Sequence, residues 1–274
     1  MQPLKQLTIH SSTLSTLSVA VVFYNNDAEL VNQLVLNIFF ATSAFKDVEL
    51  FLINNSSMNL NLTSLLQEKE KSDRRIKVII PDRNLGFGSG NNLVLPFINS
   101  DYHLIINPDV SISDDSQIPT MIEFLNQNPE IGLLSPLIKF PNGDVQRLLK
   151  KESNIFDMLL RFVGVNFFKK RQEKFISLPD GYNHVHYAEN VPGSFMVFRS
   201  SVFKAIGGFD EKYFLYMEDS DITKKVNQVS KTVFFPNAFV YHAWQRQNRK
   251  SFRGIVIMLR SMVTYFNKWG WKLF

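Results

Sequence analysis

One short segment, GGFDEKYFLYMEDSDI at residues 207–222, places five carboxylates around a block of aromatic residues. Carboxylates this close repel one another and aromatic side chains favour burial, so a segment that holds both usually has a charge to handle. A carboxylate aimed into a cleft can take a proton from a hydroxyl nucleophile, which is worth roughly 10²–10⁴ in rate. The alternative is local, because a helix beginning near Glu218 favours acidic residues in its first turn. The five carboxylates are Asp210, Glu211, Glu218, Asp219 and Asp221.

Two further motifs carry residues that bind cations. The motif INPDV places Asp109 directly after an apolar run, with Asn107 two positions earlier. A carboxylate there can hold a divalent cation that neutralises a diphosphate, although the same tripeptide also forms an ordinary Asn-Pro-Asp turn. His242 ends the run FVYH, where a lone histidine is more often structural than a metal ligand. His184 and His186 alternate along a predicted strand without a sequence partner, and we expect them to be structural.

A glycine-rich stretch, NLGFGSGNN at residues 84–92, precedes these motifs in the chain. Its glycines fall at 86, 88 and 90, and Asn91 stands where a dinucleotide fingerprint needs its third glycine. A dinucleotide site is therefore a poor match. Glycine still permits a close approach of the backbone to a ligand, and the alternative is a flexible turn that starts a helix.

Strands and helices alternate along the first half of the chain. Short apolar runs bounded by polar residues predict buried strands, and apolar residues at helical period predict the helices between them. The pattern predicts an α/β fold with a mostly parallel, Rossmann-like sheet flanked by helices. Ligands of such sheets bind beyond the carboxyl ends of the strands, where this chain carries its polar clusters. We expect strands at 17–24, 48–53, 76–80 and from 102 into the 107–109 turn, and helices at 27–40, 60–71 and from 88.

The second half loses this alternation. The stretch from Arg147 to Phe175 is basic and amphipathic, and HVHYAENVPGSFMVFRS predicts strands. EDSDITKKVNQV predicts a helix, and KTVFFPNAFVYHAW predicts a closing pair of strands.

The composition limits the class of protein. A chain of 274 residues suits one large domain, or one domain with an appendage, and 25 Phe can fill a sizeable core. The absence of cysteine excludes disulfides and thiolate metal sites. The N-terminal stretch has no apolar block typical of a signal peptide, and no run approaches the roughly 18–20 apolar residues of a membrane span. We expect a protein made and kept in the cytoplasm.

Basic residues concentrate at the C-terminal end. Ten of the 30 Lys and Arg residues follow Asp221 and no acidic residue does, which leaves 20 basic against 25 acidic residues up to that point. A basic tail favours an anionic partner, either a membrane or nucleic acid. From Gly254 the apolar residues recur at helical period opposite basic ones, which is typical of a helix in a membrane interface. The stripe comprises Ile255, Met258, Leu259, Met262, Phe266, Trp269 and Leu273, and opposite it lie Arg253, Arg260, Thr264 and Lys268.

These motifs, in this order, resemble glycosyltransferase family 2, and most closely the rhamnosyltransferase branch that builds bacterial O-antigen and related polysaccharides. The resemblance covers about residues 17–244. It implies a GT-A fold, which we expect at residues 1–245, followed by a basic amphipathic tail at 246–274. The motifs that carry it are VAVVFYN, LINNSS, RNLGFGSGNN, LIINPDV, PGSFMVFRSSVFKAIGGFDEKYFLYMEDSDI and FFPNAFVYHAW.

The resemblance implies an inverting transfer that depends on a divalent metal, Mg²⁺ or Mn²⁺. Asp109 resembles the metal-binding Asp of the family's DXD element, with Asn107 in place of its first Asp. His242 resembles the histidine that reaches the same metal. Asp219 matches the family's general base, and Glu218 beside it is expected to orient the acceptor.

The same resemblance places a nucleotide and donor-sugar pocket. Family members usually carry Asp at the position of Asn54, which reads the pyrimidine base, and Asn keeps an acceptor oxygen for that contact. Relatives often show Asp-Trp where this chain has Glu189 and Asn190. The expected donor is dTDP-L-rhamnose. The pocket residues are Tyr24, Asn25, Asn54, Arg83, Asn84, Gly86, Asn91 and Asn107.

The expected acceptor is a lipid-linked bacterial glycan at the cytoplasmic face of the inner membrane, with the tail holding the protein to the anionic bilayer. Other donors, such as galactofuranose, glucose or an N-acetylhexosamine, remain open, as does a non-catalytic module that binds glycans or nucleotide sugars. Aromatic residues at helical spacing in the tail favour a bilayer over nucleic acid, which we do not expect as a partner.

Overall fold

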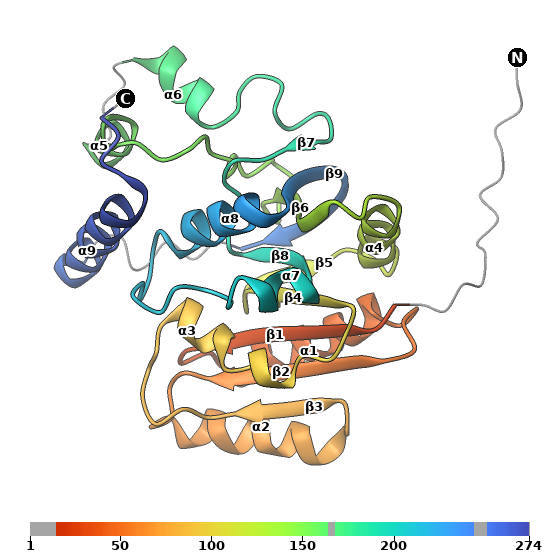
Figure 1. The fold of residues 1–274 in the computed structure, drawn as a ribbon. Helices are drawn as coiled ribbons and strands as arrows, with labels where there is room; N and C mark the ends of the chain where they lie inside the picture. The colour runs from red at the N-terminus through yellow and green to blue at the C-terminus, as the bar shows by residue number, and fades with distance from the viewer. Residues whose placement is uncertain (1–14, 164–167, 244–250, 274) are drawn as a thin grey trace, which may run out of the picture.

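The computed structural model describes residues 15–163, 168–243 and 251–273 (Figure 1). In these residues, nine strands form one mixed sheet in the order β3-β2-β1-β4-β8-β6-β9-β5, and β7 pairs with β9 outside this path. The strands are β1 Leu17–Phe23, β2 Val48–Asn54, β3 Ile76–Ile79, β4 Tyr102–Ile106, β5 Val110–Ile112, β6 Ile131–Lys139, β7 His186–Tyr187, β8 Phe195–Arg199 and β9 Lys231–His242.

The first half of the sheet is parallel, as the alternating pattern predicted. β1 pairs in parallel with both β2 and β4, and β2 pairs in parallel with β3. Strands covered on both faces read as continuous apolar runs, and β1 is buried along almost its whole length. Helix α1, Ala28–Ala41, begins where the sequence predicted, because Asp27 accepts a hydrogen bond from the Leu30 backbone N–H.

The second half of the sheet is mixed. β8 runs antiparallel to both β4 and β6, and β9 pairs in parallel with β6. The closing pair of strands predicted for KTVFFPNAFVYHAW is wrong, because residues 231–242 form one strand. A register shift against β6 falls between Phe235 and Phe239. This bulge accommodates Pro236, which has no N–H to donate to a ladder, without ending the strand.

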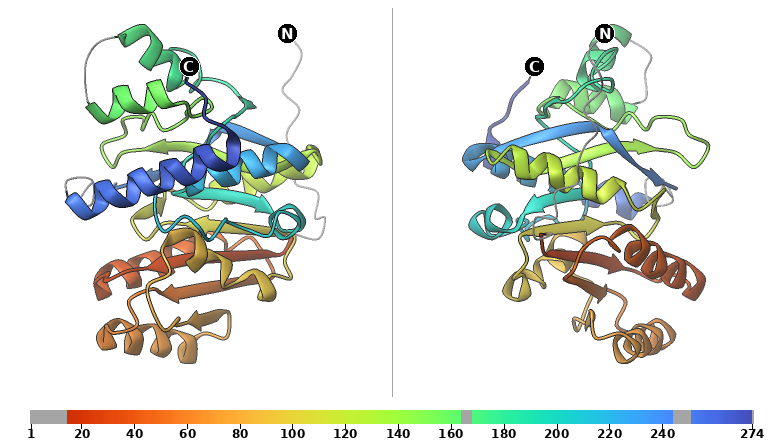
Figure 2. Two further views of the ribbon diagram at one scale, coloured as in Figure 1. Left: turned by 60° about the vertical axis from the view of Figure 1, so that its left-hand side comes forward. Right: turned by 90° about the vertical axis from the view of Figure 1, so that its right-hand side faces the viewer.

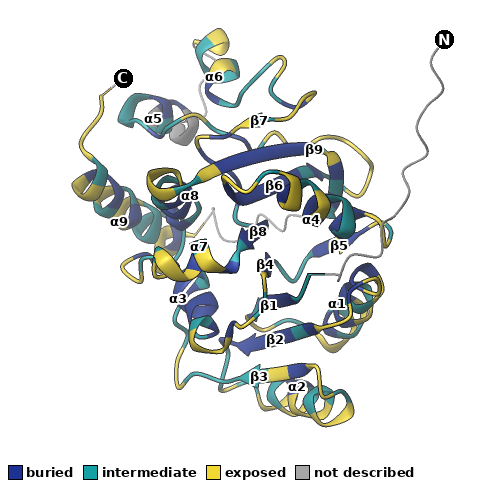
Figure 3. Cartoon of the chain, turned by 45° about the vertical axis from the view of Figure 1, so that its right-hand side comes forward, coloured by how far each residue is buried: buried dark blue, intermediate teal, exposed yellow. Residues whose placement is uncertain are grey.

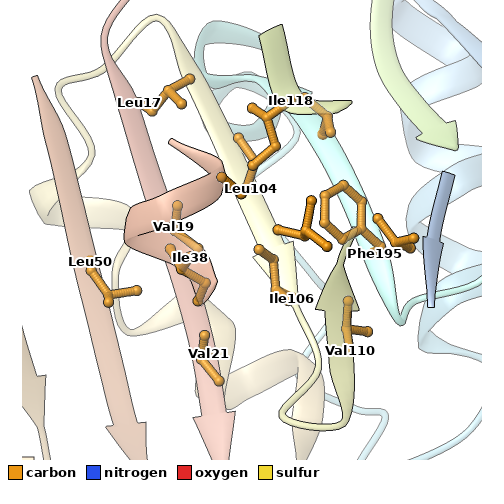
Figure 4. Packing of buried hydrophobic residues seen from close by; sticks show 14 of the residues in the cluster. Leu17, Val19, Val21, Ile38, Leu50, Leu104, Ile106, Val110, Ile118 and Phe195 are labelled. Carbon is orange, nitrogen blue, oxygen red and sulfur yellow. The ribbon is translucent and has the colours of Figure 1, made fainter. Parts of the chain in front are cut away.

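Helices cover both faces of the sheet (Figures 1 and 2). Apolar residues of α1, α2 (Leu60–Ser72) and α4 (Gln117–Gln127) pack in one large core with one face. Figure 4 shows Ile38 of α1 beside Val19 of β1 and Leu104 of β4. A second core, on the other face, includes residues of α7 (Ser200–Ala205) and α8 (Glu218–Val229). Figure 3 shows the buried sheet between helices whose outer faces are exposed.

The helix predicted from residue 88 is shorter than expected. Helix α3 covers Phe87–Asn92, and a 3₁₀ turn, η1, follows at Leu95–Phe97. Pro96 has no N–H for an intrahelical bond and its ring crowds the preceding turn, so one continuous α-helix is not favoured there.

The C-terminal helix α9, Phe252–Trp269, lies on the side of the molecule where β1 ends (Figures 1 and 2). Two shorter helices, α5 (Ile155–Val163) and α6 (Lys169–Phe175), lie near the end of the chain, and the Ile155 N–H donates to the Lys272 carbonyl. In the parts of the chain that the structure describes, no helix is both long and apolar enough to span a bilayer.

The inner face of α9 packs against the domain. Tyr265 and Phe266 are buried against Tyr213 and Met217, with Met262 and Trp269 beside them. The apolar stripe predicted to face a membrane is therefore partly covered by protein. The predicted boundary at 245/246 falls in residues 244–250, outside the described residues.

Candidate active site

A pocket of about 420 Å³ opens beyond the carboxyl ends of the parallel strands. Turns that follow β1, β2, β3 and β4 line one part of it, and the aromatic segment and the N-terminal end of α9 line the rest. Five residues that the sequence placed in the donor or metal site are among its lining residues: Tyr24, Asn84, Gly86, Asn107 and Asp109.

Asp109 and His242, both predicted metal ligands, lie side by side. His242 Nε2 is 3.2 Å from Asp109 Oδ1. The contact arises from the antiparallel pairing of β5 with β9, in which Val110 lies opposite His242 and the Ala243 N–H donates to the Asp109 carbonyl. Asp109 lines the pocket and His242 is buried behind it.

Gln146 determines how this pair can bind a cation. Its Nε2 donates to the His242 carbonyl, so its Oε1 is the atom that lies 3.0 Å from His242 Nδ1. An amide oxygen only accepts, and Nδ1 therefore carries the proton. In the neutral form of the ring, Nε2 presents its lone pair to the Asp109 carboxylate. Two acceptors in contact repel unless a proton or a cation lies between them, and this is the ligand orientation that metal-binding histidines show.

The donor set fits a magnesium or manganese ion that shares its shell with a substrate. Among the described residues no group of three His, Asp, Glu or Cys side chains could hold a metal. Mg²⁺ is commonly bound by one or two carboxylates, substrate phosphates and waters, so a two-residue site suffices beside a diphosphate. Asn107 lines the pocket with Asp109, and its Oδ1 is buried without a hydrogen-bond partner among the described residues.

Gly86 joins the glycine-rich turn to the aromatic segment. Its φ is +82°, and a Cβ built there would lie 2.0 Å from the Phe214 carbonyl oxygen. The Phe87 N–H donates to the same oxygen. The close backbone approach expected at this glycine is thus made to the protein's own chain, and the approach to a ligand stays a prediction.

The aromatic segment at residues 213–216 has two roles, one at the pocket and one in the core. Phe214, Leu215 and Tyr216 line the pocket, whereas Tyr213 is fully buried and its hydroxyl faces Asp221 Oδ1 at 3.3 Å. Tyr216 and Met217 have φ values of +70° and +65°. Two consecutive non-glycine residues in this region are strained, and such strain concentrates at functional sites.

Two of the five carboxylates hold α9 in place. Asp221 is completely buried and accepts hydrogen bonds from the side chains of Lys268 and Trp269, at 3.0 and 2.7 Å. Lys268 also lies 2.8 Å from Asp210. These contacts offset the repulsion within the cluster, so Asp210 and Asp221 have a structural role.

Glu218 and Asp219 open helix α8, as predicted. Asp219 accepts from the Ser220 N–H and lies 3.7 Å from Lys150 Nζ. Burial, with the neighbouring charge of Asp219, raises the pKa of Glu218 to about 8. The raised pKa favours the neutral acid form of Glu218, while Asp219 beside it has a cationic partner.

Gly193 connects Asp219 with the pocket. A Cβ built on Gly193 would lie 3.5 Å from Asp219 Cβ and 3.4 Å from a ring carbon of Phe87, which lines the pocket. Asp219 and the Phe87 ring thus flank Gly193, but neither Asp219 nor Glu218 is among the residues that line the pocket.

The family model of glycosyl transferase family 2 matches residues 18–206. The chain belongs to this family. An N-acetylglucosaminyl-diphospho-decaprenol L-rhamnosyltransferase of Mycobacterium tuberculosis is 27% identical over 189 residues, which cover 61% of this chain and 58% of the relative. Rhamnosyltransferase WbbL of Escherichia coli is 27% identical over 184 residues, with 61% and 64% covered. The chain thus spans about three fifths of the length of these relatives.

The fold is that of the GT-A glycosyltransferases. A mannosyltransferase from Pyrobaculum calidifontis, solved with GDP-Man and Mn²⁺, superposes with a TM-score of 0.66 at 14% identity. The match covers 93% of this chain and 64% of that structure.

Several residues that the family resemblance placed in the nucleotide-sugar site do not line the pocket. Asn54 is buried, its Oδ1 accepts from both the N–H and the hydroxyl of Ser56, and its Nδ2 donates to Thr63. Both lone pairs of the amide oxygen are therefore used, and Asn54 offers no free acceptor to a base in this conformation. Asn25 and Arg83 are exposed outside the lining, and Asn91 is buried in α3 with its Nδ2 bonded to the Phe87 carbonyl.

Other positions in this family member line the pocket without having been predicted. Asn55 lies next to Asn54, and its Nδ2 donates to the Gly86 carbonyl. Strand alternation could have separated the two, because neighbouring residues point to opposite faces. Arg253 also lines the pocket, and no local pattern could have shown this, because the pocket joins α9 to segments far away in the sequence.

Glu189 and Asn190 stand where relatives often carry Asp-Trp, and both form hydrogen bonds within the protein. Glu189 accepts from Lys151 and from the Glu152 N–H. Asn190 donates to the Ser220 hydroxyl in α8, and its carbonyl accepts from the Lys150 N–H. Neither lines the pocket; Asn190 supports the segment that brings Lys150 to Asp219.

Proposed function

We propose that the protein is an inverting, metal-dependent glycosyltransferase that moves L-rhamnose from dTDP-L-rhamnose to a hydroxyl of a lipid-linked bacterial glycan. The observation that carries this is the Asp109–His242 pair at the edge of a pocket beyond the parallel strands. Relatives named as rhamnosyltransferases support the sugar, and one whose name includes a diphospho-decaprenol supports a lipid-linked acceptor.

The two ends of the displacement use different residues. Asp109 and His242 Nε2 would hold a divalent cation. That cation, when bound, supplies positive charge against the departing diphosphate. Asn84 lines the same pocket and can offer its side-chain Nδ2 to the donor, because its Oδ1 already accepts from the Gly86 N–H.

The acceptor end is assigned to Asp219. The acceptor oxygen forms a bond to the anomeric carbon, the bond from that carbon to the phosphate oxygen breaks, and the hydroxyl proton passes to Asp219. Attack opposite the leaving group inverts the anomeric configuration. Glu218, whose raised pKa favours the neutral acid, would donate a hydrogen bond to the acceptor and so orient it.

The test is transfer by purified protein across a panel of nucleotide sugars, with and without EDTA. We expect turnover with dTDP-L-rhamnose, its loss in EDTA and its recovery with Mn²⁺ or Mg²⁺. Asp219→Asn is expected to retain donor binding and lose roughly 10²–10⁴ in kcat. Asp144→Asn, an exposed carboxylate in a turn, is the matched control and should keep wild-type rates.

The outcomes separate the alternatives. Turnover with another donor, such as UDP-glucose or UDP-galactofuranose, would replace the sugar and keep the reaction. Binding of a nucleotide sugar without turnover on any glycan acceptor would favour a non-catalytic binding module. Undiminished turnover by Asp219→Asn would remove Asp219 as the base.

Peripheral binding to the cytoplasmic face of the inner membrane is part of the proposal. The sequence assigned Arg246, Arg249, Lys250 and Arg253 to this contact. The first three lie outside the described residues, and Arg253 lines the pocket. On the described part of α9, an apolar ridge stays exposed: Phe252 at 82%, and Leu259 and Val263 at 47% each. Exposed apolar residues on a basic helix suit an anionic interface.

A flotation assay with anionic liposomes tests this ridge. The triple variant Phe252→Ser, Leu259→Ser, Val263→Ser should float less than the wild type. The single exposed variant Leu36→Ser, on α1, controls for general loss of surface hydrophobicity. Flotation of the triple variant at the wild-type level would remove the ridge as a membrane contact.

A further inference from the structure

Arg253 lies in the first turn of α9 and lines the same pocket as Asp109. It forms no ion pair with any residue that the structure describes. We propose that Arg253 binds the diphosphate of the nucleotide donor. The inference rests on the proposed nucleotide-sugar transfer and adds a phosphate-binding residue from the tail.

The charge balance of the pocket supports this role. Asp109 is an anion on the pocket wall, so a diphosphate needs cations to offset both its own charge and that carboxylate. A cation at Asp109 and His242 provides one source, and the Arg253 guanidinium provides another. Arginine suits phosphate oxygens because its planar group donates two parallel hydrogen bonds.

The helix that carries Arg253 adds to the positive electrostatic potential at the pocket. α9 has 18 residues, and its N-terminal end, capped by the Ser251 hydroxyl, lines the pocket. The positive end of a helix dipole favours anions within the first turn. Arg253 therefore projects from backbone that already favours a phosphate.

The docking of α9 keeps Arg253 at the pocket. The Ser261 hydroxyl donates to the Leu215 carbonyl of the pocket wall, and Trp269 and Lys268 bind the buried Asp221 of α8. Helix α8 begins with Glu218 and Asp219. The proposed phosphate-binding residue and the proposed base are thus tied to one rigid framework.

Binding experiments distinguish contact of Arg253 with the phosphates from a general role in the shape of the pocket. With Mn²⁺ present, Arg253→Ala should weaken dTDP and UDP binding by about 10- to 100-fold in calorimetry, the range for a charge-assisted hydrogen bond. Thymidine, which lacks phosphates, should bind Arg253→Ala as it binds the wild type in NMR titration. Arg253→Lys should fall between the two, because it keeps the charge and loses the paired donors.

Arg260→Ala is the matched control, since Arg260 is an exposed arginine on the same helix and outside the pocket. It should bind dTDP as the wild type does. Liposome flotation distinguishes binding of Arg253 to the donor's phosphates from its binding to lipid phosphates. If Arg253→Ala loses flotation and keeps its dTDP affinity, the arginine serves the bilayer and the inference is overturned.

Two further results would overturn it. One is a dTDP affinity within twofold of wild type in a folded Arg253→Ala, which leaves the proposed transfer intact. The other is an equal loss for thymidine and dTDP, which points to a distorted pocket. Lost dTDP affinity with no rhamnose transfer by the wild type would support the inference and contradict the sugar assignment.

Discussion

His242 Nε2 lies 3.2 Å from Asp109 Oδ1, and Gln146 holds the opposite side of the imidazole ring. The three residues come from separate parts of the chain. Because Gln146 accepts from Nδ1, the neutral form of the ring would present Nε2 to the cation that we propose beside Asp109. The pair therefore offers a direct test of metal binding.

His242→Ala removes a predicted ligand, and Gln146→Leu removes the group that orients it. We expect His242→Ala to weaken Mn²⁺ binding at least tenfold, and Gln146→Leu by about 10- to 100-fold, in EPR titrations with dTDP present. His184→Ala, an exposed histidine elsewhere, should bind Mn²⁺ as the wild type does. Unchanged Mn²⁺ affinity in both site variants would show that this pair is not the metal site.

Glu218 should make stability depend on pH. Its pKa is about 8 in the folded protein, against an ordinary value of 4.5. Between these values the folded state holds a proton that the unfolded state has lost, so the free energy of unfolding falls as pH rises from about 4.5 to about 8. Glu218→Gln should flatten this decline, by a few kcal/mol, in urea unfolding at several pH values.

The exposed Glu68→Gln is the matched control and should reproduce the wild-type pH profile. A Glu218→Gln profile that declines as steeply as the wild type across this window would show that Glu218 is ionised in the folded protein.

Lys268 and Lys272 allow a comparison of a buried and an exposed ion pair on one segment. Lys268→Ala leaves Asp221, which is completely buried, without its cation, and should lower the free energy of unfolding by about 3 kcal/mol. Lys272→Ala breaks an exposed pair with Glu152 and should cost less than about 1 kcal/mol. Urea denaturation measures both. Equal losses would mean that Asp221 does not depend on α9.

Gly86 and Gly143 separate a steric clash from backbone strain. Both have positive φ, at +82° and +91°, but a Cβ at Gly143 meets nothing within 4 Å. Gly143→Ala should cost only the left-handed penalty of roughly 1 kcal/mol. Gly86→Ala also pushes against the Phe214 carbonyl and should cost about 1–3 kcal/mol more in thermal unfolding. If both variants unfold at the same temperature, the Gly86–Phe214 contact adds no steric cost to Gly86→Ala.

Local patterns predicted the parallel half of the sheet well. The strand at β1, the Asp27 cap of α1 and the start of α8 at Glu218 were all expected from residues close together in the sequence. Propensity, periodicity and capping act over a few residues, so a single sequence carries them. The turn at Asp109 was placed at the ligand edge for the same reason, because the carboxyl ends of parallel strands share that edge.

The contacts between distant segments needed the tertiary structure. The sequence showed that α9 has an apolar stripe, but a protein core and a bilayer are both apolar, so periodicity could not tell which one covers Phe266. It also could not show that Lys268 meets a buried carboxylate or that Arg253 reaches the pocket. The sequence by itself determined the elements and the chemistry they carry. Only the packing of α9 against α8 decided which of its charges face solvent, because that depends on surfaces brought together by the whole fold.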